Sequence, residues 1–328
     1  EFLVSAAPHL SEGTTTPRIM FEVVAAMLPL VVMGIWLFGL AGIVLPVVTV
    51  GACLVTEAVA NRMRGRDQAS LRDGSAIVTG LILALSLPPS INPYMAAIGG
   101  AVAIALAKAV FGGIGQNLFN PAMVGRAFLM VCFPVAMTTW TEPTTHKTVG
   151  DVDAVTQATP LASVAAAAKG GTATAAGQQL SMQQLFDGRV AGCLGETSAL
   201  LALVGGLYLV FRRVADWRQP VGMLGAAMVF ALIGHALAPG LVAHPLVHLN
   251  SGALMFGAFF IATDYVGAPL SSRGRLIFGI GAGLIVMTIR VFGGYPEGVM
   301  YAILIMNALT PLIERWTVPT PFGGKVPA

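Results

Sequence analysis

Long apolar stretches dominate this chain, and they constrain its fold more than any other feature. A helix needs about 20 apolar residues to cross the hydrocarbon core of a bilayer. The chain is 56% hydrophobic and only 10% charged, whereas soluble domains carry about 25% charged residues. The sequence therefore predicts an all-α polytopic membrane protein with about ten transmembrane helices. We expect them at residues 19–39, 42–60, 75–90, 93–111, 121–138, 193–211, 219–238, 249–267, 275–292 and 297–314.

Basic residues between the apolar stretches predict the orientation of these helices. Lys and Arg concentrate in cytoplasmic loops, and four segments carry such clusters: 61–72, 211–218, 271–275 and 314–316. Ten spans with a cytoplasmic N-terminus place all four on the cytoplasmic side, and the C-terminus with them. The net charge of +3 is too small to indicate nucleic-acid binding.

The chain divides into two transmembrane halves, 1–138 and 191–328, joined by a loop at 139–190 that the same topology makes periplasmic. The tripeptide FGG occurs at 111–113 and again at 292–294. Because each half has five helices, an odd number, the second half must be inverted relative to the first. Inverted five-helix repeats with broken or re-entrant segments are typical of transport folds.

Several kinds of chemistry lack their usual sequence signals. The chain has no phosphate-binding loop, no dinucleotide-binding strand–glycine–helix context and no catalytic triad, so we expect no catalytic residues on it. Its cysteines, Cys53, Cys132 and Cys193, form no CxxC pair. An iron–sulfur cluster normally needs four thiolates. We therefore expect no metal site, and we interpret the cysteines as buried, inert thiols.

Ionisable residues inside membrane spans are costly and are functional candidates by default. Asp264 is the first candidate for ion coupling, because it lies deep in a helix that we expect to be broken. Glu57 and Glu297 are further candidates for an ion pathway. Lys108 and Arg126 are expected to extend their charged ends to the cytoplasmic interface. The alternative for all these residues is pairing between helices or subunits.

The longest polar interval of the chain contains the segment DAVTQATPLA, residues 153–162. Loops as long as 139–190 are usually functional or disordered. Taken alone, the segment is equally consistent with an ordinary polar loop.

Four long stretches resemble a known family: FGGIGQNLFNPAMVGRAFL at 111–129, GETSALLALVGGLYL at 195–209, FGAFFIATDYVGAP at 256–269, and residues 273–313. They are similar to the family that contains the D subunit of the Rnf complex and the homologous B subunit of Na⁺-translocating NADH:quinone reductase. The resemblance covers nearly the whole chain.

This resemblance implies a membrane subunit of an NADH:ferredoxin oxidoreductase that moves Na⁺ or H⁺ across a bacterial inner membrane. The subunit would not be active alone, and the A-, B-, C-, E- and G-type subunits would be its partners. Two alternatives remain: the B subunit of the quinone reductase, and a channel or transporter of the same architecture without a redox role.

The resemblance also implies flavin cofactors. In the family, FMN is esterified to a threonine in the pattern Asp-x-x-[Ser/Thr]-x-Ala-Thr by a separate flavin transferase. The matching residues here are Asp153, Thr156, Ala158 and Thr159, which makes Thr159 the expected attachment point. Gln157 departs from the usual Gly.

A second, non-covalent flavin, riboflavin or another, is also expected in the membrane. Glycines allow a ring or an ion to approach the backbone closely. We therefore place the second flavin at the segment between the fourth and fifth spans, where a structural re-entrant turn is the alternative. The candidate residues are Gly112, Gly113, Gln116, Asn117 and Asn120.

Overall fold

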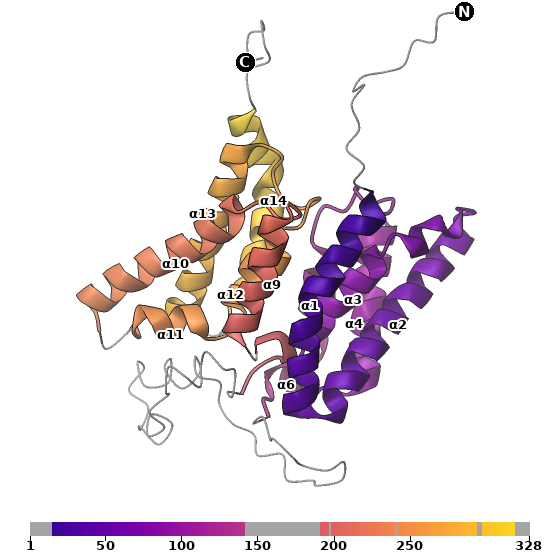
Figure 1. Ribbon diagram of the computed structural model, residues 1–328, viewed down its shortest axis with the longest axis horizontal. Helices are drawn as coiled ribbons and strands as arrows, with labels where there is room; N and C mark the ends of the chain where they lie inside the picture. The colour runs from indigo at the N-terminus through magenta and orange to yellow at the C-terminus, as the bar shows by residue number, and fades with distance from the viewer. Residues whose placement is uncertain (1–14, 142–190, 197, 240–241, 294–296, 319–328) are drawn as a thin grey trace, which may run out of the picture.

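The computed structural model describes residues 15–141, 191–196, 198–239, 242–293 and 297–318. The elements in these ranges are helices, as the sequence predicts. They form two groups that lie side by side in Figure 1, one built from the first half of the chain and one from the second.

The first half begins with two long antiparallel helices joined by one residue. Pro17 lies in the first turn of α1 (Thr16–Phe38), where its missing N–H leaves no hydrogen bond unmade. Gly39, with φ of 59°, ends α1 and lets the chain reverse directly into α2 (Leu40–Met63). The remaining elements are η1 (Gln68–Arg72), α3 (Ser75–Leu85), α4 (Pro93–Ile104), the π-helical turn η2 (Ala105–Ala109), α5 (Pro121–Cys132) and α6 (Pro134–Thr138).

The second half contains a shorter first helix, two long helices, a final helix and one broken helix. Its elements are η3 (Leu194–Glu196), α9 (Ala199–Phe211), α10 (Arg218–Leu237), α11 (Pro245–Asn250), α12 (Leu254–Phe256), the π-helical turn η4 (Gly257–Ile261), α13 (Ser272–Phe292) and α14 (Val299–Thr317).

Several predicted spans are shorter than expected or are divided. Among the described helices, α1, α2, α10 and α13 are long and apolar enough to cross a membrane. The helix expected at 75–90 ends at Leu85, just before the Pro88–Pro89 pair. The helix expected at 121–138 is interrupted at Phe133, which precedes Pro134. The span expected at 249–267 is divided among α11, α12 and η4.

Glycines allow the helices of each half to pack backbone against backbone. A Cβ added at Gly283 of α13 would lie 2.3 Å from the carbonyl oxygen of Met223 on α10, and one at Gly80 of α3 would lie 2.6 Å from Val50 Cα on α2. Small residues at such crossings are typical of membrane helices, where close van der Waals packing drives association. The two halves meet in the same way, since a Cβ at Gly205 of α9 would lie 2.5 Å from the Ala26 carbonyl oxygen on α1.

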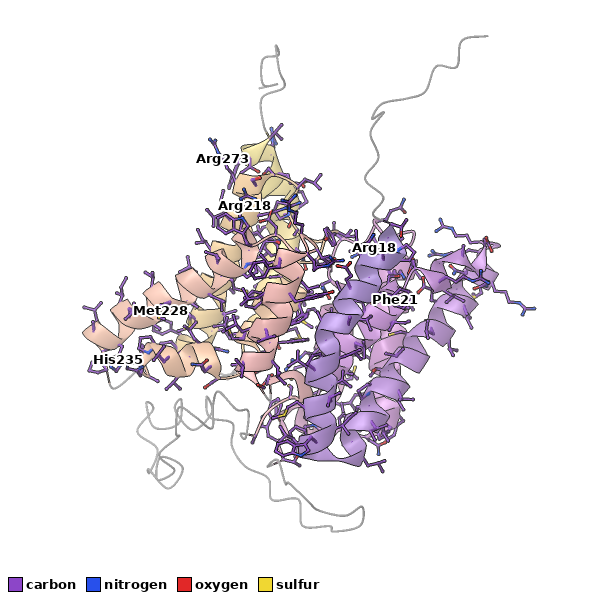
Figure 2. All side chains as sticks on the ribbon, in the orientation of Figure 1. Arg18, Phe21, Arg218, Met228, His235 and Arg273 are labelled. Atoms are coloured by element: carbon purple, nitrogen blue, oxygen red, sulfur yellow. The ribbon has the colours of Figure 1, made fainter. Side chains whose placement is uncertain are left out.

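The four basic segments lie at one end of the molecule. Figure 2 shows Arg18, Arg218 and Arg273 at this end and His235 at the opposite one. Arg212 pairs with Glu22 near the start of α1 at 2.7 Å, and α2 returns to the same end because it runs antiparallel to α1. A hydrogen bond of 2.6 Å between Ser271 Oγ and Thr317 Oγ1 brings the end of α14 there as well. We call this the basic end.

Candidate functional site

A cavity of about 100 Å³ lies between the two halves. Apolar side chains of α1, α9 and η4 form much of its wall, including Val23, Leu209 and Phe260. The polar residues that line it come from both halves, and they include Ser75, Thr79, Lys108, Asn117, Asn120 and Asp264. Ionisable and amide side chains therefore converge on one cavity at the boundary between the halves.

Lys108 reaches the cavity from the π-helical turn η2 and forms a buried ion pair. Its Nζ lies 2.7 Å from Glu57 Oε1 and 2.6 Å from Ser75 Oγ. Both charged side chains are nearly inaccessible. The expectation that Lys108 extends to the interface is wrong, because a carboxylate on α2 compensates its charge inside the protein. Glu57, a predicted ion-pathway residue, therefore already has a cationic partner.

Asp264 follows η4 and differs from Glu57 in having no basic partner within the described residues. Its Oδ2 accepts a hydrogen bond from Asn120 Nδ2 at 3.3 Å, and its Oδ1 accepts one from Val266 N at 3.3 Å. Asn307 of α14 bonds Asn120 and the segment that follows Asp264, since its Oδ1 accepts from Asn120 N at 3.2 Å and its Nδ2 donates to Gly267 O at 2.8 Å. Carboxylate, amide and carbonyl oxygens of this kind suit a proton or a hard cation.

The five residues predicted for a second flavin separate into two groups. Asn117 and Asn120 are buried and line the cavity. Gly112, Gly113 and Gln116 do not line it. They form a turn near the end of α2, where the Arg66 guanidinium donates to Gly112 O. The φ angles of 125° and 112° at the two glycines explain why this turn needs glycine.

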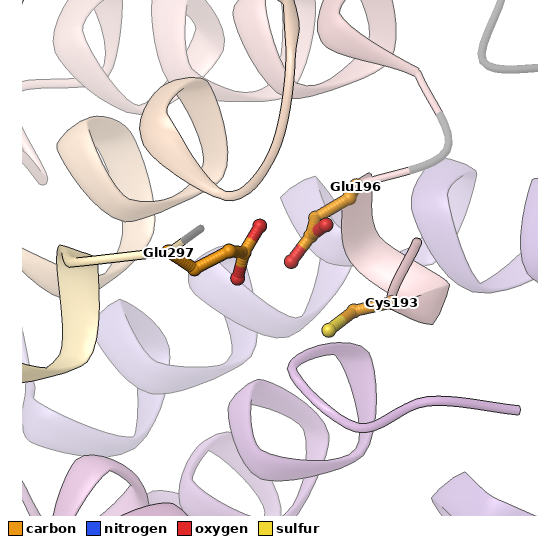
Figure 3. Close-up of side chains that lie close together, drawn as sticks. All are labelled: Cys193, Glu196 and Glu297. Atoms are coloured by element: carbon orange, nitrogen blue, oxygen red, sulfur yellow. The ribbon is translucent and has the colours of Figure 1, made fainter. Parts of the chain in front are cut away.

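A second polar cluster lies deeper between the halves, on the side away from the basic end. It contains Cys193 and Glu196 of the segment before α9 and Glu297 of the segment before α14, whose side chains face one another in Figure 3. One ligand atom of each residue lies within 4.8 Å of the others. We call this group, together with Arg126, the carboxylate cluster.

Arg126 of α5 is buried in the carboxylate cluster rather than extended to the interface. Its Nη2 lies 3.2 Å from Glu297 Oε2 and 3.5 Å from Cys193 Sγ. Glu297 Oε1 also accepts a hydrogen bond from Ala253 N at 3.2 Å. The predicted exposure of the Arg126 charge is wrong because Glu297, a distant residue in sequence, compensates it. Sequence reasoning identified Glu297 as a candidate but did not select Glu196.

The other predictions have mixed outcomes. Asp153, Thr156, Ala158 and Thr159 lie outside the described residues. Cys53 and Cys193 are buried as expected, whereas Cys132, at the end of α5, is exposed.

The fold and the buried charges define a class: a multi-pass α-helical membrane protein whose two halves enclose ionisable side chains at their boundary. Comparison with known proteins narrows this class to one family. The model of the NQR2, RnfD, RnfE family matches residues 3–323, and the chain belongs to that family.

Three relatives resemble the chain over almost its full length. The D subunit of the proton-translocating ferredoxin:NAD(+) oxidoreductase complex of Clostridium ljungdahlii is 42% identical over 99% of this chain and 97% of its own length. The D subunit of the Na(+)-translocating ferredoxin:NAD(+) oxidoreductase complex of Acetobacterium woodii is 41% identical over 98% of this chain and 95% of its own length. The D subunit of an ion-translocating oxidoreductase complex of Halorhodospira halophila is 41% identical over 97% of this chain and 94% of its own length.

Proposed function

We propose that this chain is the D subunit of an ion-translocating ferredoxin:NAD⁺ oxidoreductase complex in a bacterial inner membrane. The observation that carries the proposal is the similarity to such subunits over nearly the whole of both chains. NADH and ferredoxin would bind to other subunits, of the A, B, C, E and G types. The exposed apolar faces of the spans would contact lipid and these subunits.

Asp264 is the residue that we propose for ion coupling. It is a carboxylate on the cavity between the halves, and its partners Asn120 and Val266 carry no charge. Glu57 and Glu297 are the alternatives, but each is already paired with a buried cation. Similarity does not select the ion, because the two relatives named for H⁺ and Na⁺ are 42% and 41% identical to the chain.

The arrangement of the basic residues supports the proposed topology. All four basic segments lie at one end, which the positive-inside rule makes cytoplasmic. In each half, a basic residue before the FGG motif also bonds a serine at one end of a short helix: Lys108 bonds Ser75 Oγ at the start of α3, and Arg290 bonds Ser251 O, directly after α11, at 3.0 Å. These two contacts lie toward opposite ends of the molecule, as an inverted repeat requires.

Lys108 and Arg290 differ by one position in their distance from the FGG motif, and the local helix geometry accounts for this difference. Lys108 precedes Phe111 by three positions and Arg290 precedes Phe292 by two. The first half carries the π-helical turn η2 at this point, and a π-turn holds one more residue than an α-turn. This correspondence supports the proposed relation between the halves.

Covalent FMN at Thr159, added by a flavin transferase, is part of the proposal. The test is flavin fluorescence of the purified protein on a denaturing gel, after expression with the transferase. We expect a fluorescent wild-type band, no fluorescence for Thr159→Val, and wild-type fluorescence for the matched control Thr172→Val in the same loop. A wild-type band without flavin fluorescence would reject the redox function and favour a channel or transporter. Fluorescence of Thr159→Val would reject only the attachment site.

We also propose that a second, non-covalent flavin binds beside Asn117 and Asn120. Small-molecule pockets usually occupy about 300–1,000 Å³, so the cavity of about 100 Å³ must widen to admit the ring. Acid extraction releases non-covalent flavin from the purified complex. We expect the Asn117→Leu complex to release one flavin fewer per complex than the wild type. Equal release would place this flavin elsewhere.

The remaining alternative is the B subunit of Na⁺-translocating NADH:quinone reductase, a member of the same family. Purification of the complex distinguishes the two. Co-purification of a subunit with several ferredoxin-type clusters supports the present proposal. Quinone reduction by the purified complex supports the alternative.

A further inference from the structure

The carboxylate cluster contains two acidic side chains, Glu196 and Glu297, that face each other. Glu196 and Glu297 approach from segments about a hundred residues apart in sequence, and both carboxylates point into the same space in Figure 3. Two ionised carboxylates are both hydrogen-bond acceptors, so they cannot bond to each other and they repel. A buried contact of this kind requires either a cation or a proton between them.

The two carboxylates have different environments. Glu297 is equipped to remain ionised, because Arg126 Nη2 donates to its Oε2 and Ala253 N donates to its Oε1, each at 3.2 Å. Glu196 is 8% exposed, and its Oε1 is buried with no hydrogen-bond partner. A buried acceptor that lacks a donor is costly when it carries charge and much less so when it is the oxygen of a neutral acid. The asymmetry assigns the proton to Glu196.

The remaining donors in the cluster disfavour a metal ion. The Arg126 guanidinium lies 3.5 Å from Cys193 Sγ and 3.2 Å from Glu297 Oε2, so a positive charge already contacts two of the three possible ligands. Cys193 Sγ lies 3.1 Å from Ser86 O, which accepts a hydrogen bond from its thiol. A metal ligand would need the thiolate. A proton on Glu196 needs neither the ligand atoms that Arg126 contacts nor a thiolate.

A second guanidinium makes the ionised form of Glu196 attainable. Arg290 of α13 bonds Ser251 O, two residues before Ala253, whose N–H donates to Glu297. Its Nη atoms bond the carbonyl oxygens of His248 and Ser251 at 2.6 and 3.0 Å, and its buried Nε has no partner. With both arginines charged, the cluster is neutral when both carboxylates are ionised and carries one positive charge when Glu196 is protonated. The proton can therefore leave without stranding an uncompensated charge.

Among the described residues, the other elements packed around Glu196 contribute backbone atoms and one imidazole, that of His248. α3 and α12 contribute backbone atoms, Ser86 O and Ala253 N. The titratable residues of α1, Arg18 and Glu22, lie near the basic end. The imidazole of His248 on α11 is buried, and its nitrogens have no partner.

We propose that Glu196 and Glu297 form a reversible proton-binding site at the boundary between the two halves, with Glu196 holding the proton in the resting state. The ligand is a single proton shared between the two carboxylates. The site is distinct from the cavity at Asp264, and its occupancy does not depend on which ion the complex translocates.

Infrared difference spectroscopy of the full chain in its complex tests the proposal directly. We expect a protonated carboxylic C=O band at neutral pH that shifts in D₂O, disappears at alkaline pH, is absent in Glu196→Gln and changes frequency in Glu297→Gln. The control Glu22→Gln, at the Arg212 pair, should leave the band unchanged. The absence of such a band, or its persistence in Glu196→Gln, would overturn the proposal. Replacement of the band on titration with Zn²⁺ or Na⁺ at neutral pH would overturn it in favour of a cation site.

Thermal stability gives a second readout that does not depend on transport. Glutamine resembles a protonated carboxyl group, so Glu196→Gln should melt close to wild type at neutral pH. Glu297→Gln should melt well below wild type, because Arg126 loses its counter-ion inside the protein. The reverse order would overturn the assignment of the proton to Glu196.

Discussion

Lys108 Nζ and Glu57 Oε1 lie 2.7 Å apart, both buried, at the edge of the cavity between the two halves. The pair joins α2 to the π-helical turn η2 across 51 positions of sequence. Because Ser75 Oγ also accepts from Lys108, the same ammonium group holds the start of α3. This contact therefore supports one wall of the cavity as well as the packing of the first half.

Removing one partner of this pair should be strongly destabilising. Lys108→Met leaves Glu57 charged and buried without compensation, a loss that typically costs about 3–5 kcal/mol. The double variant Lys108→Met/Glu57→Gln should recover more than half of the loss, because no buried charge remains. Thermal unfolding in detergent, followed by tryptophan fluorescence, measures both. A double variant no more stable than the single one would show that the pair does not act through charge.

Close packing of α10 against α13 predicts that two glycine variants will differ in stability. Gly283→Ala would place a Cβ 2.3 Å from the Met223 carbonyl oxygen, and the helices would have to separate. Overpacking typically costs about 1–3 kcal/mol. The matched control is Gly225→Ala in α10, where an added Cβ meets nothing within 4 Å. The melting temperature of Gly283→Ala should fall while that of Gly225→Ala stays at or above wild type. Equal melting temperatures would contradict the helix crossing described above.

A third prediction concerns pH and the loop between α9 and α10. Burial raises the pKa of Asp216, but hydrogen bonds from Arg218 N–H and the Arg275 guanidinium lower it more, so the pKa falls below its ordinary 3.8. Arg275 Nη1 and Arg218 Nη1 lie 2.7 and 3.0 Å from Oδ2. A lowered pKa in the folded state stabilises the protein above the unfolded pKa. The contribution disappears as the pH falls through the folded value.

Asp216→Asn should therefore be less stable than wild type at neutral pH, and the difference should shrink as the pH falls below about 4. Melting temperatures of the two proteins across this range provide the test. A difference that is constant with pH would mean that the carboxylate charge does not contribute.

Much of the helical architecture follows from the sequence because apolar length, proline and glycine act locally. The long spans and the reversal at Gly39 can be derived from neighbouring residues alone. The basic segments share one end, as their composition predicts. The break at Phe133 could also have been predicted, because Pro134 disfavours helical backbone in the residue before it.

The partners of buried charges could not be derived in this way. Lys108 and Arg126 were expected to extend to the interface because both lie on the predicted cytoplasmic side of their spans. Their partners, Glu57 and Glu297, are 51 and 171 positions away and become neighbours only when the helices pack. The same reason explains why Glu196 was not selected as a candidate site residue. Its significance depends on the facing carboxylate of Glu297, which is distant in sequence.

Ion transport by sealed vesicles that contain the complex, driven by reduced ferredoxin and NAD⁺, tests the central claim most directly. Asp264→Asn removes a cavity-lining carboxylate that has no basic partner among the described residues, and Asp67→Asn, in the exposed loop at the basic end, is the control. We expect Asp264→Asn to lower the rate of Na⁺ or H⁺ transport at least about tenfold, equivalent to roughly 1.4 kcal/mol, while Asp67→Asn transports at the wild-type rate. Wild-type transport by Asp264→Asn would contradict the account.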